Sequence, residues 1–347
     1  MTIFNRFWRS NFMIKLRHWE YWPFGILQFP VLFYYLWLSL RARSFLFFTA
    51  SNTGIEMGGM FGESKFKILD KIPQAYKAKT IFIKHNSSFI HVLQQMNEAG
   101  LIFPVIFKPD LGERGYRVKR IANEAEAQQY ISTFKFDFLV QELVDLPEEF
   151  GVFYRRLPSQ IKGEVFSIVG KELLTVTGNG KSSLQELILS KDRAKLQWDT
   201  LKLQHTAQLN RVIPSGEIFL LNAIGNHCLG TTFLNSNHLI SEELNNSFDK
   251  ISNQIEGFYY GRFDLRCESV AALTAGRIKI LELNGCGAEP AHIYQPGFSF
   301  WKAVGVMFTH WHYIFKIAQE NNKLGAVYLT YTEAKMFYQK FKTAVQP

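Results

Sequence analysis

Two short apolar stretches carry acidic and basic residues with the spacing of β-strands. The first reads GRFDLR and the second, some fifteen residues later, reads ILELN. Because successive side chains of a strand point to opposite faces, Arg262 and Asp264 share a face, and so do Glu282 and Asn284. If the strands pair, two carboxylates, a carboxamide and a guanidinium meet on one patch. Oxygen ligands of this kind hold Mg²⁺ beside a phosphate, whereas the alternative is a salt-bridged sheet surface.

A second stretch, LIFPVIFKPDLGERGYRVKRI, puts a lysine where a short buried strand ends. Lys108 is followed by a loop that contains Gly112, Arg114 and Gly115. A fixed cation beside free backbone N–H groups is what a polyphosphate requires. Arg114 could add a planar pair of donors. The alternative is a β-hairpin with a flexible tip and a solvated lysine.

The elements between these motifs alternate short strands with helices. A helix is expected after Asn123, a good N-cap, and another after Ser183, which starts a capping box. Further helices are expected over 192–208 and 242–256. An antiparallel meander is expected from strands 150–155, 164–169 and 172–177, with Gly170 and Lys171 in a turn. The run GNGKS resembles the end of a phosphate-binding P-loop, but the first glycine of that motif would fall at Thr175, so a glycine turn is expected.

The composition is that of a globular protein in a reducing compartment. The 347 residues are 47% hydrophobic and 20% charged, enough for two or three subdomains. The three cysteines form no Cys-x-x-Cys pair, which suits the cytoplasm. The net charge is +9, and much of the excess lies near the amino terminus. Up to Arg43 only Glu20 opposes six basic residues: Arg6, Arg9, Lys15, Arg17, Arg41 and Arg43.

The basic residues flank an uncharged and almost wholly apolar run, PFGILQFPVLFYYLWLSL. A membrane-spanning helix needs about 20 apolar residues, so this run is slightly short, and Pro30 interrupts it. It could form a buried core helix, an element that docks on an anionic membrane surface, or a span. The glycine-rich stretch 52–65 follows and is expected to be a loop, with the border of a substrate site as an alternative.

Over roughly residues 79 to 296, the ordered motifs resemble the ATP-grasp superfamily of carboxylate–amine ligases, in particular D-alanine–D-alanine ligase and cyanophycin synthetase. Lys108 resembles the family's strand-end lysine on the nucleotide phosphates, and the loop with Gly112, Arg114 and Gly115 resembles its phosphate-covering loop. The family's first nucleotide lysine would fall near Lys84, where no motif fixes it.

The same resemblance gives roles to the residues that follow. Gln141, Glu142 and Leu143 match the hinge that meets the adenine, and Glu149 matches the acid on the ribose. Arg262 would face the transferred phosphate. The implied ligands of Mg²⁺ or Mn²⁺ are the oxygen-bearing side chains of the strand pair: Asp264, Glu282 and Asn284.

The implied fold is α+β, with two lobes around a nucleotide cleft. Residues 1–75 would form an aromatic, basic segment at a membrane surface or a substrate site, in place of the family's amino-terminal domain. Residues 76–300 would form the ATP-grasp domain, with a smaller nucleotide lobe at 76–142 and a larger, metal-binding lobe at 143–300. Residues 301–347 would form carboxy-terminal helices that pack on this body or on the aromatic segment.

The implied activity is ATP-dependent ligation, in which phosphorylation turns a carboxylate into an acyl phosphate that an amine attacks. The expected partners are ATP and small carboxylate and amine substrates, either amino acids or small peptide-like molecules, and the expected location is the cytoplasm or the inner face of its membrane. Candidate grips for a substrate carboxylate are Arg155, Arg156 and Arg211, and candidate acids or bases are His227 and His292.

Two alternatives stay open: a kinase that releases a phosphorylated product, and a non-catalytic nucleotide-binding protein at a membrane. Nucleic-acid binding is disfavoured because no basic strand with interleaved aromatic residues is present.

Overall fold

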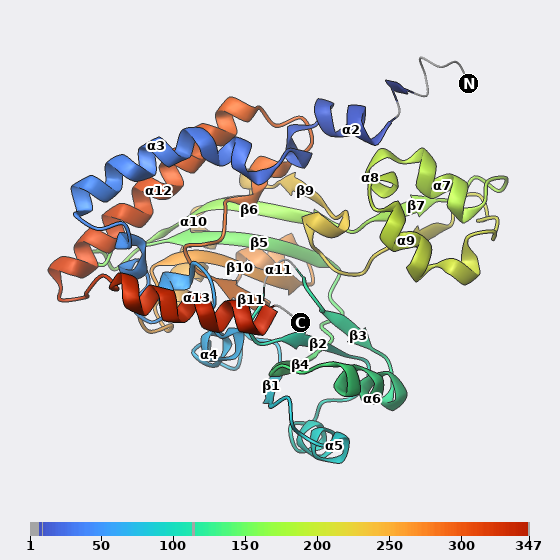
Figure 1. The fold of residues 1–347 in the computed structure, drawn as a ribbon, viewed down its shortest axis with the longest axis horizontal. Helices are drawn as coiled ribbons and strands as arrows, with labels where there is room; N and C mark the ends of the chain where they lie inside the picture. The colour runs from blue at the N-terminus through green and yellow to red at the C-terminus, as the bar shows by residue number, and fades with distance from the viewer. Residues whose placement is uncertain (1–6, 9, 113–114, 346–347) are drawn as a thin grey trace.

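The computed structural model describes residues 7–8, 10–112 and 115–345. Its centre is a five-stranded antiparallel sheet in the order β11-β10-β5-β6-β9 (Figure 1). The strands are β5 (Glu148–Arg155), β6 (Glu164–Glu172), β9 (Thr232–Asn235), β10 (Tyr260–Cys267) and β11 (Lys279–Asn284). Helices α10 (Glu242–Ser252) and α11 (Val270–Thr274) pack on this sheet. Their apolar residues and those of the central strands form the largest buried cluster of the described chain.

A four-stranded antiparallel sheet forms a smaller lobe beside the first. Its order is β1-β4-β2-β3: β1 (Thr80–Ile83), β2 (Val105–Pro109), β3 (Lys119–Ile121) and β4 (Phe138–Glu142). Helices α5 (Phe89–Glu98) and α6 (Glu124–Thr133) belong to this lobe, which has a buried core of its own. As the sequence predicts, the Asn123 side chain caps α6 by accepting a hydrogen bond from Glu126 N at 3.0 Å.

A third unit lies to the right of the large sheet in Figure 1. It contains β7 (Thr175–Thr177), β8 (Ile218–Leu220), α7 (Leu184–Ser190), α8 (Asp192–Lys195) and α9 (Trp198–Gln204). The predicted three-stranded meander is therefore wrong in its last strand, because β7 pairs with β8 and not with β6. Gly170 and Lys171 lie inside β6 and not in a turn, since β6 continues straight and pairs with β9. The expected capping box at Ser183 and Glu186 is present.

The two ends of the chain pack together on the large lobe. Helix α3 (Phe24–Ala42) lies along α12 (Phe300–Lys323), so the expected pairing of the carboxy-terminal helices with the aromatic segment is confirmed for α12 (Figure 1). A stripe of α3 that includes Leu27, Val31 and Leu38 is buried. The remaining helices are α2 (Asn11–Arg17), α4 (Lys65–Asp70) and α13 (Tyr331–Val345).

The opposite face of α3 is exposed, although its residues are apolar. The exposed side chains are Phe24, Ile26, Phe29, Leu32, Phe33, Leu36, Trp37 and Leu40. Helix α3 is thus half buried and half exposed, and it is not the fully buried core helix that the sequence left open. In the described part of the chain, α3 is the one helix long and apolar enough to cross a membrane, judged by length and composition.

The lobes meet where β11 runs beside the strand region that precedes β1. Ile280 N donates to Tyr76 O at 2.7 Å, and Ala78 N donates to Ile280 O at 2.9 Å. The chain thereby carries the smaller sheet against the end of the larger sheet that bears β10 and β11. The division of the chain at residues 75, 142 and 300 stays a prediction.

Candidate functional site

Strands β10 and β11 pair in the register that the sequence pattern requires. Arg262 lies opposite Asn284, and Asp264 lies opposite Glu282. Directly opposed residues of antiparallel strands share a face, so the four polar side chains lie on one side of the sheet. Strand β10 also pairs with β5 and is central in the sheet. The patch is therefore built on a fully paired strand and not on a loop.

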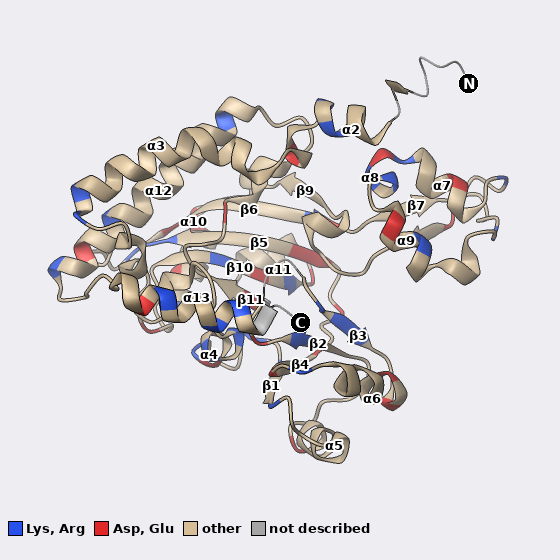
Figure 2. Cartoon of the chain, viewed as in Figure 1, with Lys and Arg blue, Asp and Glu red and all other residues tan. Residues whose placement is uncertain are grey.

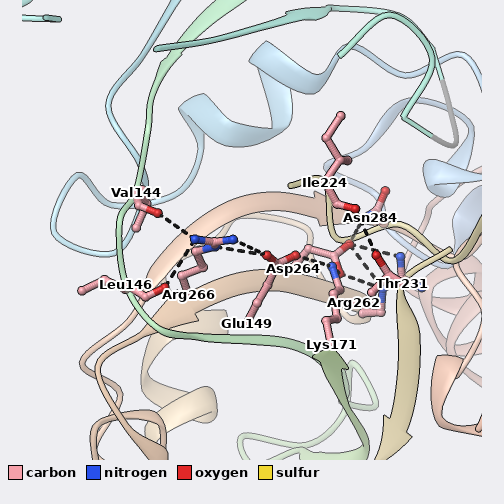
Figure 3. A network of polar contacts seen from close by, with 10 residues as sticks. All are labelled: Val144, Leu146, Glu149, Lys171, Ile224, Thr231, Arg262, Asp264, Arg266 and Asn284. Carbon is pink, nitrogen blue, oxygen red and sulfur yellow. Dashed lines mark hydrogen bonds and ion pairs between the residues drawn. The ribbon is translucent and has the colours of Figure 1, made fainter. Parts of the chain in front are cut away.

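Asp264 lies at the centre of this patch and is buried. Its carboxylate accepts from Arg262 Nη2 at 3.1 Å and from Asn284 Nδ2 at 2.9 Å, and it lies 2.9 Å from Lys171 Nζ (Figure 3). Burial alone would raise the pKa of this carboxyl, but the charges of Arg262 and Lys171 outweigh it and lower the pKa to about 2. Asp264 is therefore a fixed anion at neutral pH.

Lys171 joins Asp264 to Glu149, and its role was missed by the sequence analysis. Lys171 Nζ lies 3.1 Å from Glu149 Oε1, and Arg266 Nη2 lies 2.9 Å from Glu149 Oε2 (Figure 3). Burial disfavours the charged amine, yet Asp264 and Glu149 raise the pKa of Lys171 above its ordinary value. The available signal was a lysine placed directly after Gly170 at the end of an apolar strand pattern.

Arg266 extends the same network toward the hinge between the lobes. Its Nη1 donates to the carbonyl oxygens of Val144 at 3.2 Å and Leu146 at 3.4 Å (Figure 3). Both oxygens of Glu149 are thus already bound to cations. A carboxylate has about four acceptor positions, so capacity remains for a hydroxyl group.

Lys108 approaches the patch from the smaller lobe. It is buried at the end of β2, and its Nζ donates to Gln141 Oε1 and to Leu281 O, both at 3.0 Å. Burial lowers the pKa of Lys108 to about 8. Leu281 is a residue of β11, next to Glu282. Lys108 therefore lies on the same side of the molecule as Asp264, across the junction of the two sheets.

The loop after β2 is held by a second lysine that the sequence analysis did not single out. Lys65, the first residue of α4, donates to the backbone oxygen of Gly112 and lies 3.5 Å from Glu282 Oε1. Asp110 fixes this arrangement by accepting from Ser64 Oγ and Phe66 N, both at 2.9 Å. Arg114, which the sequence assigns to the nucleotide, lies outside the described residues.

These groups line one cavity of about 630 Å³ between the lobes, a volume typical of small-molecule sites. It brings together every described residue of the predicted set: Lys108, Gly112, Gly115, Gln141, Glu142, Leu143, Glu149, Arg262, Asp264, Glu282 and Asn284. Met60 and Lys65 of the glycine-rich stretch also border it. The predicted residues that line the cavity lie up to 176 positions apart in sequence, from Lys108 to Asn284, yet their roles stay predictions.

The arginines that the sequence offered as carboxylate grips lie elsewhere. Arg155 pairs with Glu164 at 2.8 Å, Arg211 pairs with Glu217 at 2.9 Å, and Arg156 donates to the backbone of a neighbouring turn. Among the residues that line the cavity none of these three arginines is found.

Of the two candidate histidines and Lys84, His227 borders the cavity and the other two do not. His292 is held by Ser167 Oγ at 2.7 Å, whereas His227 borders the cavity. Burial lowers the pKa of both histidines to about 4, so both are neutral at pH 7. Lys84 is exposed and is not among the residues that line the cavity.

The donor set suits a hard divalent cation. Asp264, Glu282 and the carboxamide of Asn284 present oxygen atoms on one face of two paired strands, and oxygen ligands are what Mg²⁺ and Mn²⁺ prefer. Among the described residues, no group of three or more His, Cys, Asp and Glu side chains could hold a metal by itself. The third ligand would therefore have to be the amide, as the sequence predicts.

No protein-family model matches the sequence, and no curated protein matches it. Solved structures do match. A bifunctional glutathione synthetase from Pasteurella multocida is similar at 14% identity over 71% of this chain and 36% of that chain, with a TM-score of 0.37. A D-alanine–D-alanine ligase from Bacillus anthracis is similar at 12% identity over 78% of this chain and 72% of that chain, with a TM-score of 0.44. The VanG D-Ala:D-Ser ligase from Enterococcus faecalis is similar at 13% identity over 72% and 61%, with a TM-score of 0.38.

The chain thus spans 36% of the first of these proteins and 61% of the third. All three are named as ligases or synthetases, the kind of enzyme that the sequence motifs resemble. Because these TM-scores lie below 0.5, functional conclusions depend on the residues of this chain and not on these likenesses. By its own topology the chain is an α+β protein whose two lobes enclose a charged cavity, which is the fold class predicted from its resemblance to the ATP-grasp superfamily.

Proposed function

We propose that the chain is an ATP- and Mg²⁺-dependent ligase that activates a carboxylate as an acyl phosphate and joins it to an amine. One observation carries the proposal. The strand-end lysine, the acid–amide pair of β10 and β11 and the acid of β5 line the same cavity, although they come from separate motifs. A salt-bridged sheet surface alone would not require Lys108 and Glu142 of the smaller lobe to border that cavity.

Five cations border the cavity around its acidic centre. Lys65, Lys108, Lys171, Arg262 and Arg266 border it near Asp264, Glu282 and Glu149. Of the cations, Lys108 is held by uncharged oxygen acceptors. A buried lysine without an acidic partner is stabilised by the phosphates of a nucleotide. We assign Lys108 and Arg262 to the phosphates, the segment Gln141, Glu142 and Leu143 to the base, and Glu149 to the ribose.

The metal would be held by Asp264, Glu282 and Asn284, where it would neutralise charge on the transferred phosphate. The residues of the chain act by positioning and by charge. Lys108, fixed at 3.0 Å by two oxygen acceptors, needs no reorganisation to meet an anion. Arg262 is fixed by Asp264 and by the backbone oxygen of Glu289 at 3.2 Å, so its guanidinium is already oriented.

In the proposed reaction a substrate carboxylate oxygen attacks the γ-phosphorus of ATP, and the bond from that phosphorus to ADP breaks. ADP leaves with the bonding electrons. The nitrogen of an amine then attacks the acyl carbon, the bond to phosphate breaks, and inorganic phosphate leaves. The amine loses one proton. His227 borders the cavity as a neutral imidazole, but burial lowers its pKa to about 4 and makes it a weak acceptor for that proton.

The test is ADP release by the purified full-length protein with Mg-ATP, screened across pools of amino acids, hydroxy acids, peptides and other carboxylates. Glu282→Gln is expected to lower ADP release by about 10²-fold or more, because the site loses a charge but keeps its shape. Asp264→Asn should do the same. Glu268→Gln, an identical change at an exposed residue just after β10, should have no effect.

Hydroxylamine identifies the outcome of phosphoryl transfer, because it traps an acyl phosphate as a hydroxamate. Substrate-dependent hydroxamate supports the ligase. A stable phosphorylated product without hydroxamate would indicate a kinase on the same scaffold. Normal ADP release by both Glu282→Gln and Asp264→Asn would overturn the metal assignment.

We further propose that the chain contacts the inner face of an anionic membrane through the exposed face of α3. Glu20, the one acid up to Arg43, is paired with Arg193, and its side chain is only 4% exposed. The exposed charges around α3 are therefore basic in the described part of the segment: Lys15, Arg17, Arg41 and Arg43. Figure 2 shows α3 without charged residues along most of its length. An apolar helical face flanked by basic and aromatic residues has the chemistry of an interfacial element.

A further inference from the structure

The cavity does not end at the charged cluster but continues to the beginning of α3. Arg262 Nη1 donates to Glu289 O at 3.2 Å. The Glu289 side chain accepts from Gln28 Nε2 of α3 at 2.5 Å and from the Tyr294 hydroxyl. This chain of contacts connects the guanidinium assigned to the transferred phosphate directly with α3. A substrate whose carboxylate lies at Arg262 has this part of the cavity available for the rest of its structure.

The lining of this end is aromatic and aliphatic, and we call it the aromatic compartment. It consists of Trp19, Trp22, Phe24, Leu27, Tyr294 and Phe300. The rings support one another: Trp19 lies 5.7 Å from Tyr294 and 5.8 Å from Phe300, and Trp22 lies 5.7 Å from Phe300, between centroids. The Trp19 indole is also anchored by a hydrogen bond to Phe298 O at 2.5 Å.

The charged groups that border the aromatic compartment are already engaged. Glu20 pairs with Arg193, and Glu289 binds Gln28 and Tyr294. The three arginines that could grip a second carboxylate bind groups elsewhere in the large lobe and in the unit of β7 and β8. A small zwitterionic amino acid would bury its charges here against rings, which is costly without partners. An apolar chain would instead gain by burial.

The aromatic compartment also leads to the outside at one defined place. Phe24, the first residue of α3, lines the cavity and is 54% exposed. An apolar chain too long for the compartment would therefore leave it past the Phe24 ring.

From these contacts we infer that the carboxylate substrate is amphiphilic: its carboxylate lies at Arg262 and its apolar chain lies in the aromatic compartment, leaving past Phe24. The inference rests on the proposed function for the role of Arg262. It adds the chemical class of the acid, which the charged cluster alone does not indicate.

The experiment compares N-acylglycines with acetyl, hexanoyl and decanoyl chains, at monomeric concentrations and without membranes. Binding is followed by the fluorescence of the tryptophans in the presence of Mg-ADP, and ADP release is followed with Mg-ATP. Affinity is expected to rise roughly fourfold for each methylene group that enters the compartment. An ω-brominated decanoyl chain should quench fluorescence more strongly than its unbrominated counterpart, because Trp19 and Trp22 line the compartment.

Two matched variants locate the chain. Phe24→Asp puts a carboxylate at the mouth of the compartment, in the first turn of α3, where an acidic residue is compatible with the helix. It should weaken decanoyl binding at least about tenfold and leave the affinity for ADP unchanged. Phe29→Asp makes the same change on the exposed face of α3, outside the cavity lining, and should leave both affinities unchanged.

The outcomes separate this inference from the proposed function. Chain-length-dependent binding that Phe24→Asp abolishes supports the amphiphilic substrate even if no compound releases ADP, and that pair of results would count against the ligase. ADP release that is equal for acetyl and decanoyl compounds, or highest with short polar acids, overturns the amphiphilic substrate and leaves the ligase standing. Equal loss of decanoyl binding in Phe24→Asp and Phe29→Asp also overturns it, because the chain would then lie on the outer surface.

Discussion

Lys108 and Lys171 border the same cavity but differ in how burial affects their charge. Lys171 lies between two carboxylates, which keep its pKa above the ordinary value despite burial. Lys108 is held by neutral oxygen atoms, so burial dominates and lowers its pKa to about 8. The first lysine is a permanent cation that completes the site. The second is a cation whose charge depends on the presence of an anion.

Nucleotide binding should therefore be accompanied by proton uptake at Lys108. At pH 8.5 the amine is mostly neutral in the free protein, and phosphate charge nearby restores its ordinary pKa, so roughly half a proton or more is taken up per nucleotide. Calorimetry with metal-free ADP in two buffers of different ionisation enthalpy measures this number. Lys108→Arg, whose guanidinium is always charged, should bind ADP with no uptake.

The pH dependence of the free energy of unfolding gives an independent check on the lowered pKa of Lys108. The folded pKa of Lys108 is below its unfolded value of 10.5, so the unfolded state binds more protons between about pH 8 and 10.5. The contribution of Lys108 to the free energy of unfolding should thus rise with pH in this window. The calorimetric experiment has its own contrary outcome. If the Lys108→Arg protein takes up as many protons on binding ADP as the wild type does, a group other than Lys108 titrates.

At the residue scale, sequence could predict the site where alternation on strands defines a shared face. Asp264 with Glu282, and Arg262 with Asn284, follow from period-two spacing once β10 and β11 pair. Lys171 could not be predicted in the same way, because its role depends on β6 continuing beyond Gly170 to pair with β9. That pairing is between segments about sixty residues apart, and no local pattern determines it.

At the element scale, the close pairing of β10 and β11 depends on Gly261. A Cβ atom there would lie 2.2 Å from Asn284 O and 2.8 Å from Phe258 Cε2. The backbone that carries Asn284 would have to move to make room. Gly261 therefore allows the amide of one strand to reach the carboxylate of the other.

Gly261→Ala should reduce stability by about 1–3 kcal/mol, the usual cost of overpacking, and should lower ADP release because Asn284 is displaced. Gly305→Ala is the matched control. Gly305 lies in α12 with no atom within 4 Å of an added Cβ, so the change should stabilise the protein by about 0.5–1 kcal/mol. Urea unfolding of both variants provides the comparison. Equal stability of the two proteins would show that β11 can shift freely.

The sequence predicted elements correctly where local signals were strong. It failed where the structure of a segment depends on which strand pairs with it. Asn123 and Ser183 cap the helices that they were expected to cap. Strand β7 was expected beside β6, but the partner of β6 at that edge is β9, and β7 pairs with β8 in a separate unit. A strand pattern indicates which face is buried and not which strand covers its edge.

At the scale of the whole molecule, α3 has two proposed roles: its exposed face would contact a membrane, and its first residues border the cavity. One face packs on α12, while the other exposes a continuous set of apolar side chains. The start of the same helix borders the cavity. From sequence, the run 23–40 could be predicted as a helix, but its half-buried state could not. The run is apolar on all sides, and distant segments, α12 foremost, determine which face is covered.

The membrane proposal therefore predicts binding to vesicles that requires both parts of this surface. The full-length protein should sediment with vesicles containing about 30% anionic lipid at low salt and much less with zwitterionic vesicles, since each basic residue near an anionic surface contributes about 1 kcal/mol. Arg41→Gln with Arg43→Gln should remove most of the preference for anionic lipid. Phe29→Asp with Phe33→Asp should abolish binding, because these exposed rings, 5.3 Å apart, would no longer enter the lipid interface.

Ile161→Asp, at an exposed apolar residue outside α3, is the matched control and should bind normally. A dimer in solution that Phe29→Asp with Phe33→Asp converts to a monomer, with no sedimentation on anionic vesicles, would instead assign the face of α3 to a second copy of the chain.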